Sequence, residues 1–142
     1  MKKALLILSA MLFLATVASS QTVEKKPFRA YLYNNEYNVF MRINFYDQNI
    51  IIPGQELFGE MAGYLSKDGT SFCWLVVSAD AGKNTARLQM SNDYGSEDLE
   101  AELTQTNDSV YVLKQLSGST LKVPNKGKWQ KLPRVMEFKR RD

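Results

Sequence analysis

Apolar and polar positions alternate along most of the chain, in short runs separated by turn residues. The run from Tyr37 to Tyr46 is the clearest: its odd-numbered positions are all apolar, and its even-numbered positions include Asn38, Arg42 and Asn44. Successive side chains of a strand point to opposite faces, whereas a helix would scatter these apolar residues around its circumference. The pattern therefore predicts a β-strand with one buried face.

Similar runs recur at fairly even intervals and end in residues that favour tight reversals, such as Asn34-Asn35 and Asp68-Gly69. The last strand runs into a basic tail, Lys139-Arg140-Arg141. No long stretch shows a convincing helical period. Strands are predicted over residues 28–33, 37–46, 50–52, 57–65, 72–79, 85–91, 99–104, 109–115, 120–123 and 134–139.

The stretch from Leu57 to Leu65 admits two interpretations. As a helix it would carry a GxxxG spacing at Gly59 and Gly63, which has meaning inside a long apolar membrane segment. As a strand it would place Leu57, Met61 and Leu65 on one face with the two glycines, which permit sharp coiling and close approach in a barrel. We favour the strand.

Many short strands joined by tight turns indicate an all-β fold. An antiparallel meander of this length must protect its edges, and closure into a barrel removes them. We predict a single antiparallel up-and-down barrel of about eight strands over residues 28–142, with a two-sheet β-sandwich as the alternative.

The N-terminal segment, residues 1–20, has the pattern of a secretory signal peptide. Two lysines precede an apolar run over residues 4–17, and the small residues Ala18-Ser19-Ser20 follow. This arrangement predicts cleavage before Gln21 and a periplasmic or secreted protein of a Gram-negative bacterium. The apolar run is short for a bilayer, so we expect no stable membrane span. Residues 21–27 are polar and predict a flexible lead-in.

Composition narrows the chemistry. The 142 residues include no histidine and one cysteine, Cys73, which excludes a Ser-His-Asp triad, a histidine-ligated zinc site and an internal disulfide. Cys73 lies in an apolar run, where a buried cysteine acts as a small hydrophobe. Removing the signal peptide and its two lysines lowers the formal charge of +3 nearly to neutrality, which argues against nucleic-acid binding.

One acidic cluster, over residues 93–98, surrounds a glycine turn but lacks the spacing of a calcium loop. We therefore predict no metal site at this cluster. We also predict no cofactor, and no catalytic residues because no nucleophile is paired with a base. We expect a monomer.

Two sets of residues are candidates for binding. A hollow barrel would enclose one small ligand, and its lining would come from inward-facing strand residues. Its predicted contacts are Tyr37, Met41, Ile43, Leu88, Met90 and Leu103. The second set surrounds a tryptophan with lysines, a combination that suits an acidic partner. Its predicted members are Lys126, Lys128, Trp129 and Lys131.

The strand number and the short signal resemble small exported Gram-negative domains, some of which are lipocalin-like barrels. Ser117-Gly118 followed by Trp129-Gln130-Lys131 is similar to the Ser-Gly and Trp-x-Lys elements of the periplasmic inhibitors of c-type lysozyme. The chain departs from those inhibitors at Leu132, where they carry a glycine, and in lacking a cysteine pair. The resemblance implies a barrel whose loop plugs an enzyme cleft.

We therefore expect an exported, non-catalytic binding protein that holds a small apolar or amphipathic ligand inside its barrel. The alternative is a protein-binding module that acts through its loops, such as a lysozyme-type inhibitor.

Overall fold

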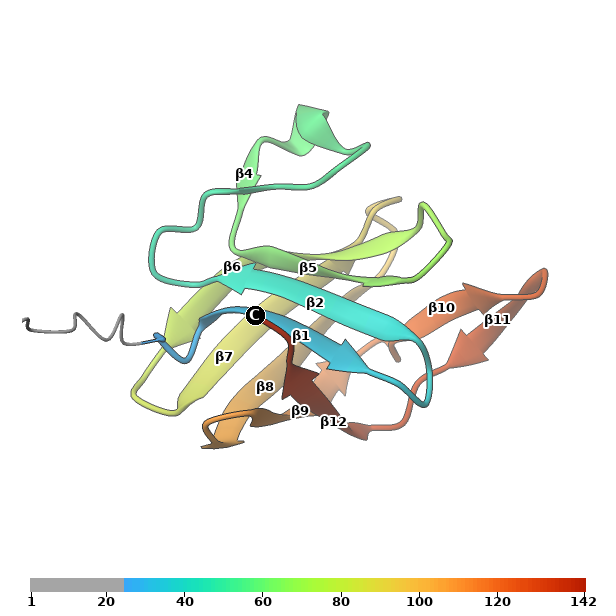
Figure 1. The fold of residues 1–142 in the computed structure, drawn as a ribbon. Helices are drawn as coiled ribbons and strands as arrows, with labels where there is room; N and C mark the ends of the chain where they lie inside the picture. Colours follow the sequence, from blue (N-terminus) through green and yellow to red (C-terminus); the bar gives the residue numbers. More distant parts are fainter. Residues whose placement is uncertain (1–24) are drawn as a thin grey trace, which may run out of the picture.

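The computed structural model describes residues 25–142, which form a closed antiparallel β-barrel (Figure 1). Strand neighbours around the barrel follow the order β1-β12-β9-β8-β7-β6-β5-β2. The barrel strands are β1 (Arg29–Asn34), β2 (Val39–Asn44), β5 (Gly63–Lys67), β6 (Cys73–Ala81), β7 (Thr85–Asn92), β8 (Asp98–Asn107), β9 (Val110–Gly118) and β12 (Val135–Arg140).

The eight strands are joined in chain order, so the predicted up-and-down barrel is confirmed and the sandwich alternative is not. Closure is made by β1 and β12, where Leu32 pairs with Arg140 and Tyr33 with Lys139. This seam leaves no strand of the barrel with an open edge. The predicted signal peptide, residues 1–20, lies outside the described residues.

The alternating pattern places one face of each strand inside the barrel. On β2 these residues are Val39, Met41 and Ile43, all buried, as the sequence pattern predicted. The largest fully buried side chains of the inner cluster include Trp74, Tyr111, Phe28, Phe138, Leu32, Met41, Leu65, Leu88, Met90, Leu103 and Leu113. The interior is thus filled by the side chains of the barrel itself.

Gly63 shows why one strand of the barrel requires a glycine. It pairs with Ile43 at the start of β5, and a Cβ atom there would lie 2.4 Å from the backbone oxygen of Arg42. Neighbouring backbones approach too closely for any side chain. The expectation that glycine permits such an approach is confirmed at this position.

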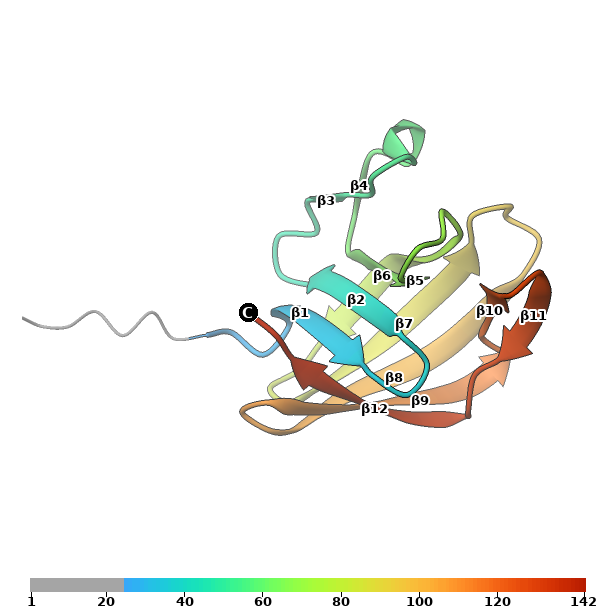
Figure 2. The same cartoon turned by 45° about the vertical axis from the view of Figure 1, so that its right-hand side comes forward.

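Two insertions extend the barrel (Figures 1 and 2). The first, residues 45–62, is named the outer loop here and contains β3 (Ile50–Ile51), the 3₁₀ turn η1 (Glu56–Phe58) and β4 (Glu60–Met61). Its Ile52 packs on the outside of the sheet against Tyr64, Cys73 and Leu75, and these four residues form the outer apolar patch.

The strand predicted from Leu57 to Leu65 is wrong in its first half. Leu57 lies in η1 and is fully exposed, Met61 packs against the outer apolar patch, and Leu65 is buried inside the barrel. The strand breaks at Ala62, between β4 and β5, so the period of two is not continuous. Three residues predicted to share a face therefore have three different environments.

The second insertion is the hairpin of β10 (Lys122–Asn125) and β11 (Lys128–Lys131), which extends from the end of the barrel opposite the C-terminus (Figure 2). The predicted strand over residues 120–123 shares only Lys122 and Val123 with β10, and β11 was not predicted. Val123 of β10 and the flanking residues Leu121 and Leu132 are buried and close this end of the barrel.

At the opposite end, Phe28 and Phe45 stack with ring centroids 5.5 Å apart. Arg140 points inward beside them and donates to the backbone oxygens of Lys26 (3.2 Å) and Arg29 (2.7 Å) and to the Tyr111 hydroxyl (3.2 Å). The described part of the predicted lead-in, residues 25–27, is thereby hydrogen-bonded to the barrel.

Candidate functional site

The residues predicted to contact an internal ligand are brought together, but as core. Met41, Ile43, Leu88, Met90 and Leu103 are all buried within one apolar cluster. Tyr37, in the turn between β1 and β2, is partly buried against it. These side chains contact one another and the large aromatic residues of the interior, so the arrangement favours packing over ligand binding.

The predicted partner-binding residues are carried by the β10–β11 hairpin. Its two-residue turn consists of Lys126 (φ +53°) and Gly127 (φ +78°), the backbone geometry of a type I′ turn. This turn sets the register, in which Trp129 lies opposite Pro124 and Lys131 opposite Lys122. Directly opposed residues of a hairpin share a face.

This register places the four predicted partner-binding residues on different parts of the hairpin. Trp129 and Lys131 share one face of the hairpin, Lys128 belongs to the other face with Val123, and Lys126 is at the tip. All four predicted residues are exposed. The four residues lie on one hairpin, but they do not form a single flat patch.

Trp129 stands in a group of aromatic side chains from three separate loops. Its ring centroid lies 4.9 Å from that of Phe72, in an edge-to-face contact, and Phe72 also contacts Tyr94 at 5.9 Å. Trp129 is 51% exposed and Tyr94 73% exposed, whereas Phe72 is buried beneath them. Beneath Phe72, Trp74 is fully buried and donates its indole N–H to the Lys122 carbonyl at 2.9 Å.

Lys122 links the aromatic group to an ion pair. Its Nζ lies 5.5 Å from the Trp129 ring centroid and 3.2 Å from a carboxylate oxygen of Glu97. A cation over an indole face is favourable. We call Phe72, Tyr94, Lys122 and Trp129 the aromatic rim.

Sequence reasoning did not find most of the rim. Phe72 and Tyr94 are far from Trp129 in the chain, and only barrel closure brings their loops to the same end. The tryptophan surrounded by lysines was the one local signal. The hairpin from Lys122 to Lys131 contains four lysines and no acidic residue, so its exposed surface is basic.

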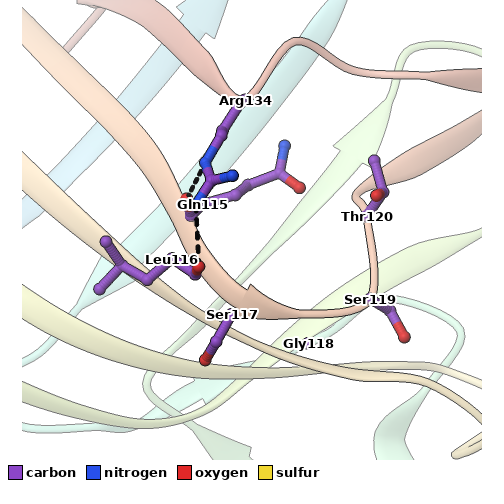
Figure 3. Close-up of a pocket in the computed structure, with 7 residues that line it drawn as sticks. All are labelled: Gln115, Leu116, Ser117, Gly118, Ser119, Thr120 and Arg134. Atoms are coloured by element: carbon purple, nitrogen blue, oxygen red, sulfur yellow. Dashed lines mark hydrogen bonds between the residues drawn. The ribbon is translucent and has the colours of Figure 1, made fainter.

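The Ser117-Gly118 element lies at the same end of the barrel, at the end of β9 (Figure 3). Gly118 has φ +90°, and a Cβ atom there would lie 2.5 Å from the Asp98 backbone oxygen. Close packing against β8 therefore accounts for this glycine. The polar hollow beside it has a volume of about 130 Å³, and Arg134 closes one side by donating to the Gln115 and Leu116 carbonyls.

Cys73 and Asp93 lie together on the outside of the sheet, under the outer loop. The Asp93 carboxylate accepts weakly from the Cys73 backbone N–H and from the Gln55 amide, both at 3.4 Å, and its second oxygen is buried without a partner. Burial raises the pKa of Asp93, and burial together with the Asp93 charge raises the pKa of the Cys73 thiol to about 11. Such a thiol is a poor nucleophile.

Among residues 25–142, no group of three or more acidic or cysteine side chains is placed to hold a metal ion. No helix in that part of the chain is long and apolar enough to cross a membrane. Comparison with protein-family models gave no match, and comparisons with curated proteins and with solved structures gave no significant similarity.

Proposed function

We propose that this protein is an exported, non-catalytic binding module that uses the aromatic rim and the β10–β11 hairpin to bind another protein. The observation that carries the proposal is the exposure of Trp129 and Tyr94 on a rigid base. Tryptophan, tyrosine and arginine supply most of the energy at protein interfaces, in part because few rotatable bonds are frozen on binding.

The rim is supported from below, which makes it a preorganised surface. Phe72 fills the space under Trp129, and the Trp74–Lys122 hydrogen bond fixes the base of the hairpin. A partner would not have to order this loop on binding, so little of the interaction energy would be lost to conformational entropy.

Charge identifies the kind of partner. The lysines at positions 126, 128 and 131 are exposed around Trp129, and the hairpin has no acidic residue to neutralise them. We therefore infer a protein partner with acidic residues around an apolar socket that receives Trp129. An enzyme cleft lined with carboxylates, as in glycoside hydrolases, meets this description, which keeps enzyme inhibition as the specific form of the proposal.

The packed interior makes this function better supported than an internal ligand. A small-molecule pocket typically has a volume of roughly 300 Å³ or more. The side chains first considered as its lining instead contact one another in the barrel core.

Site-specific photo-crosslinking tests the proposal. A photoreactive amino acid replaces Lys126 at the hairpin tip or, as a control, the fully exposed Leu57 in the outer loop. Each variant is exposed to the exported proteins of its own organism. We expect one protein to be captured from position 126 but not from position 57, through an acidic peptide.

A second substitution makes the test specific. Trp129→Ala in the position-126 variant should abolish capture, and replacing Lys128 and Lys131 by glutamate should do the same. Capture that survives Trp129→Ala, or that is equally strong from position 57, would contradict the proposal.

A further inference from the structure

The outer face of β2 carries a second set of aromatic and basic side chains, which share no residue with the aromatic rim: Arg42 is exposed, Phe40 is half-buried and Tyr64 of β5 is buried beside them. Phe40 and Arg42 are alternate residues on this face. Phe40 stacks on Tyr31 of β1 with ring centroids 5.7 Å apart, and meets Tyr64 of β5 edge to face at 5.8 Å. Arg42 is paired in register with both tyrosines.

The outer loop turns this face into a recess. Figure 2 shows the loop rising beside β2, and Ile50 and Ile52 contribute to its inner wall. Two hollows follow each other along β2. One, of about 200 Å³, is lined by Phe40, Ile52 and Tyr64; the other, of about 300 Å³, is lined by Arg29, Arg42 and Ile50.

The two hollows differ in chemistry. The first combines the apolar side chains of Phe40, Ile52 and Tyr64 with the polar residues Ser66, Thr70 and Ser71, and its volume exceeds the roughly 150 Å³ that holds one benzene ring. The second presents two guanidinium groups. Asp142 also lines this hollow and its carboxylate is paired with Arg140 at 2.8 Å, whereas neither Arg29 nor Arg42 forms an ion pair within residues 25–142.

We propose that the two hollows form one binding site for a small aromatic carboxylic acid, with the ring against Phe40 and Tyr64 and the carboxylate on Arg42. Alternate residues of a strand lie roughly 7 Å apart, a distance that a short aliphatic spacer between ring and carboxylate spans. A guanidinium can bind a carboxylate through two parallel hydrogen bonds, which fixes the orientation of the acid.

Tyr64 adds a donor to this site. Burial raises the pKa of its hydroxyl, so the group stays protonated at neutral pH and can donate to an anion. An arylalkanoate therefore matches both ends of the recess, whereas a neutral aromatic compound matches only one.

Titration with 3-phenylpropionate tests the proposal, followed by ¹⁵N NMR of the whole protein. We expect shifts confined to β2, β5 and the outer loop. Arg42→Gln should weaken binding by about tenfold or more, because a charged hydrogen bond is lost. The matched control is Arg87→Gln, which removes an exposed arginine on β7 and should leave the affinity unchanged.

Two further comparisons keep the result specific. Methyl 3-phenylpropionate should bind the unaltered protein weakly, and it should bind the Arg42→Gln variant with the same affinity. Ser71→Phe, which places a ring in the first hollow from its exposed side, should block both probes. Equal affinity in the Arg42→Gln variant, shifts centred elsewhere in the barrel, or no shifts with millimolar probe would overturn the proposal.

Discussion

Two tryptophans at the same end of the barrel have opposite environments. Trp74 is fully buried and its indole N–H is satisfied by the Lys122 carbonyl, whereas half of Trp129 is exposed above Phe72. The sequence pattern placed Trp74 on a buried strand, and the surrounding lysines made Trp129 a candidate for binding an acidic partner. The sequence could not show that Phe72 and Tyr94 lie near Trp129, because those contacts depend on closure of the barrel.

The buried state of Cys73 leads to a prediction about its reactivity. With a pKa of about 11, the thiol is almost entirely protonated at pH 8, and the outer loop covers it. We expect no reaction with a thiol reagent such as dithionitrobenzoate in native buffer, and one equivalent of reaction in denaturant. Rapid stoichiometric labelling of the folded protein would show that the loop does not protect the thiol.

Asp93 should make stability depend on pH. Because burial raises its pKa, the folded protein binds this proton more tightly than the unfolded chain, so stability falls as pH rises from about 4 through the folded pKa. Asp93→Asn should remove this dependence and stabilise the protein at pH 7. The gain should stay below about 1 kcal/mol, because the side chain is only partly buried.

Urea unfolding between pH 4 and pH 8 measures the Asp93 effect. Asp108→Asn, at an exposed turn, is the matched control and should leave the pH profile unchanged. A profile that is as steep in the Asp93→Asn variant as in the unaltered protein would assign the dependence to other groups.

Among the elements, the strands with strict alternation were the most predictable from sequence. β7 and β8 each bury one face and leave the other largely open to solvent, and β2 buries every second residue from Val39 to Ile43, so the period of two marks all three directly. The outer loop was not predictable in this way. Some of its apolar residues pack on the outside of the sheet, whereas Leu57 is fully exposed. No single period therefore describes them.

The same limit applies to β11. Its sequence, Lys-Trp-Gln-Lys, has no buried face, and it is a strand because the type I′ turn pairs it with β10. The geometry of the turn determines this strand, which the hydrophobic pattern does not predict.

Gly63 provides a test of the β2–β5 contact. Gly63→Ala would place a methyl group against the Arg42 backbone oxygen, and neither backbone can move without breaking the paired register. We expect a loss of about 2–4 kcal/mol in the free energy of unfolding, measured by urea denaturation. Gly82→Ala, in the turn before β7, is the control and should cost less than about 1 kcal/mol, because its Cβ would lie 3.2 Å from the Thr85 oxygen.

At the level of the whole molecule, Arg140 closes one end of the barrel. The sequence assigned it to a basic tail, and the structure turns it inward because strand alternation places it on the same face as Phe138. Its guanidinium binds the chain before β1, the β1 backbone and the Tyr111 hydroxyl together. One side chain thus connects the segment before β1 and the last strand to the core.

We expect Arg140→Met to lower the free energy of unfolding by about 1–3 kcal/mol, because three hydrogen bonds from a nearly buried guanidinium are lost. Amide hydrogen exchange in β1 should also become faster, because Arg140 hydrogen-bonds to the β1 backbone. Arg141→Gln removes a neighbouring charge that lies over the Tyr33 ring at the surface, and it should cost less than about 1 kcal/mol. Equal effects of the two substitutions would show that net charge, and not the inward network, is responsible.

The seam between β1 and β12 also determines the order in which the protein can fold. The groups that it joins are as far as 111 positions apart, so the final pairing must wait until almost the whole chain is available. Until then β1 and β9 each present an unpaired edge, and a chain lacking its last strand would expose both. Contacts so distant in sequence carry the highest loop-closure entropy, and they make barrel closure the expected slow step of folding.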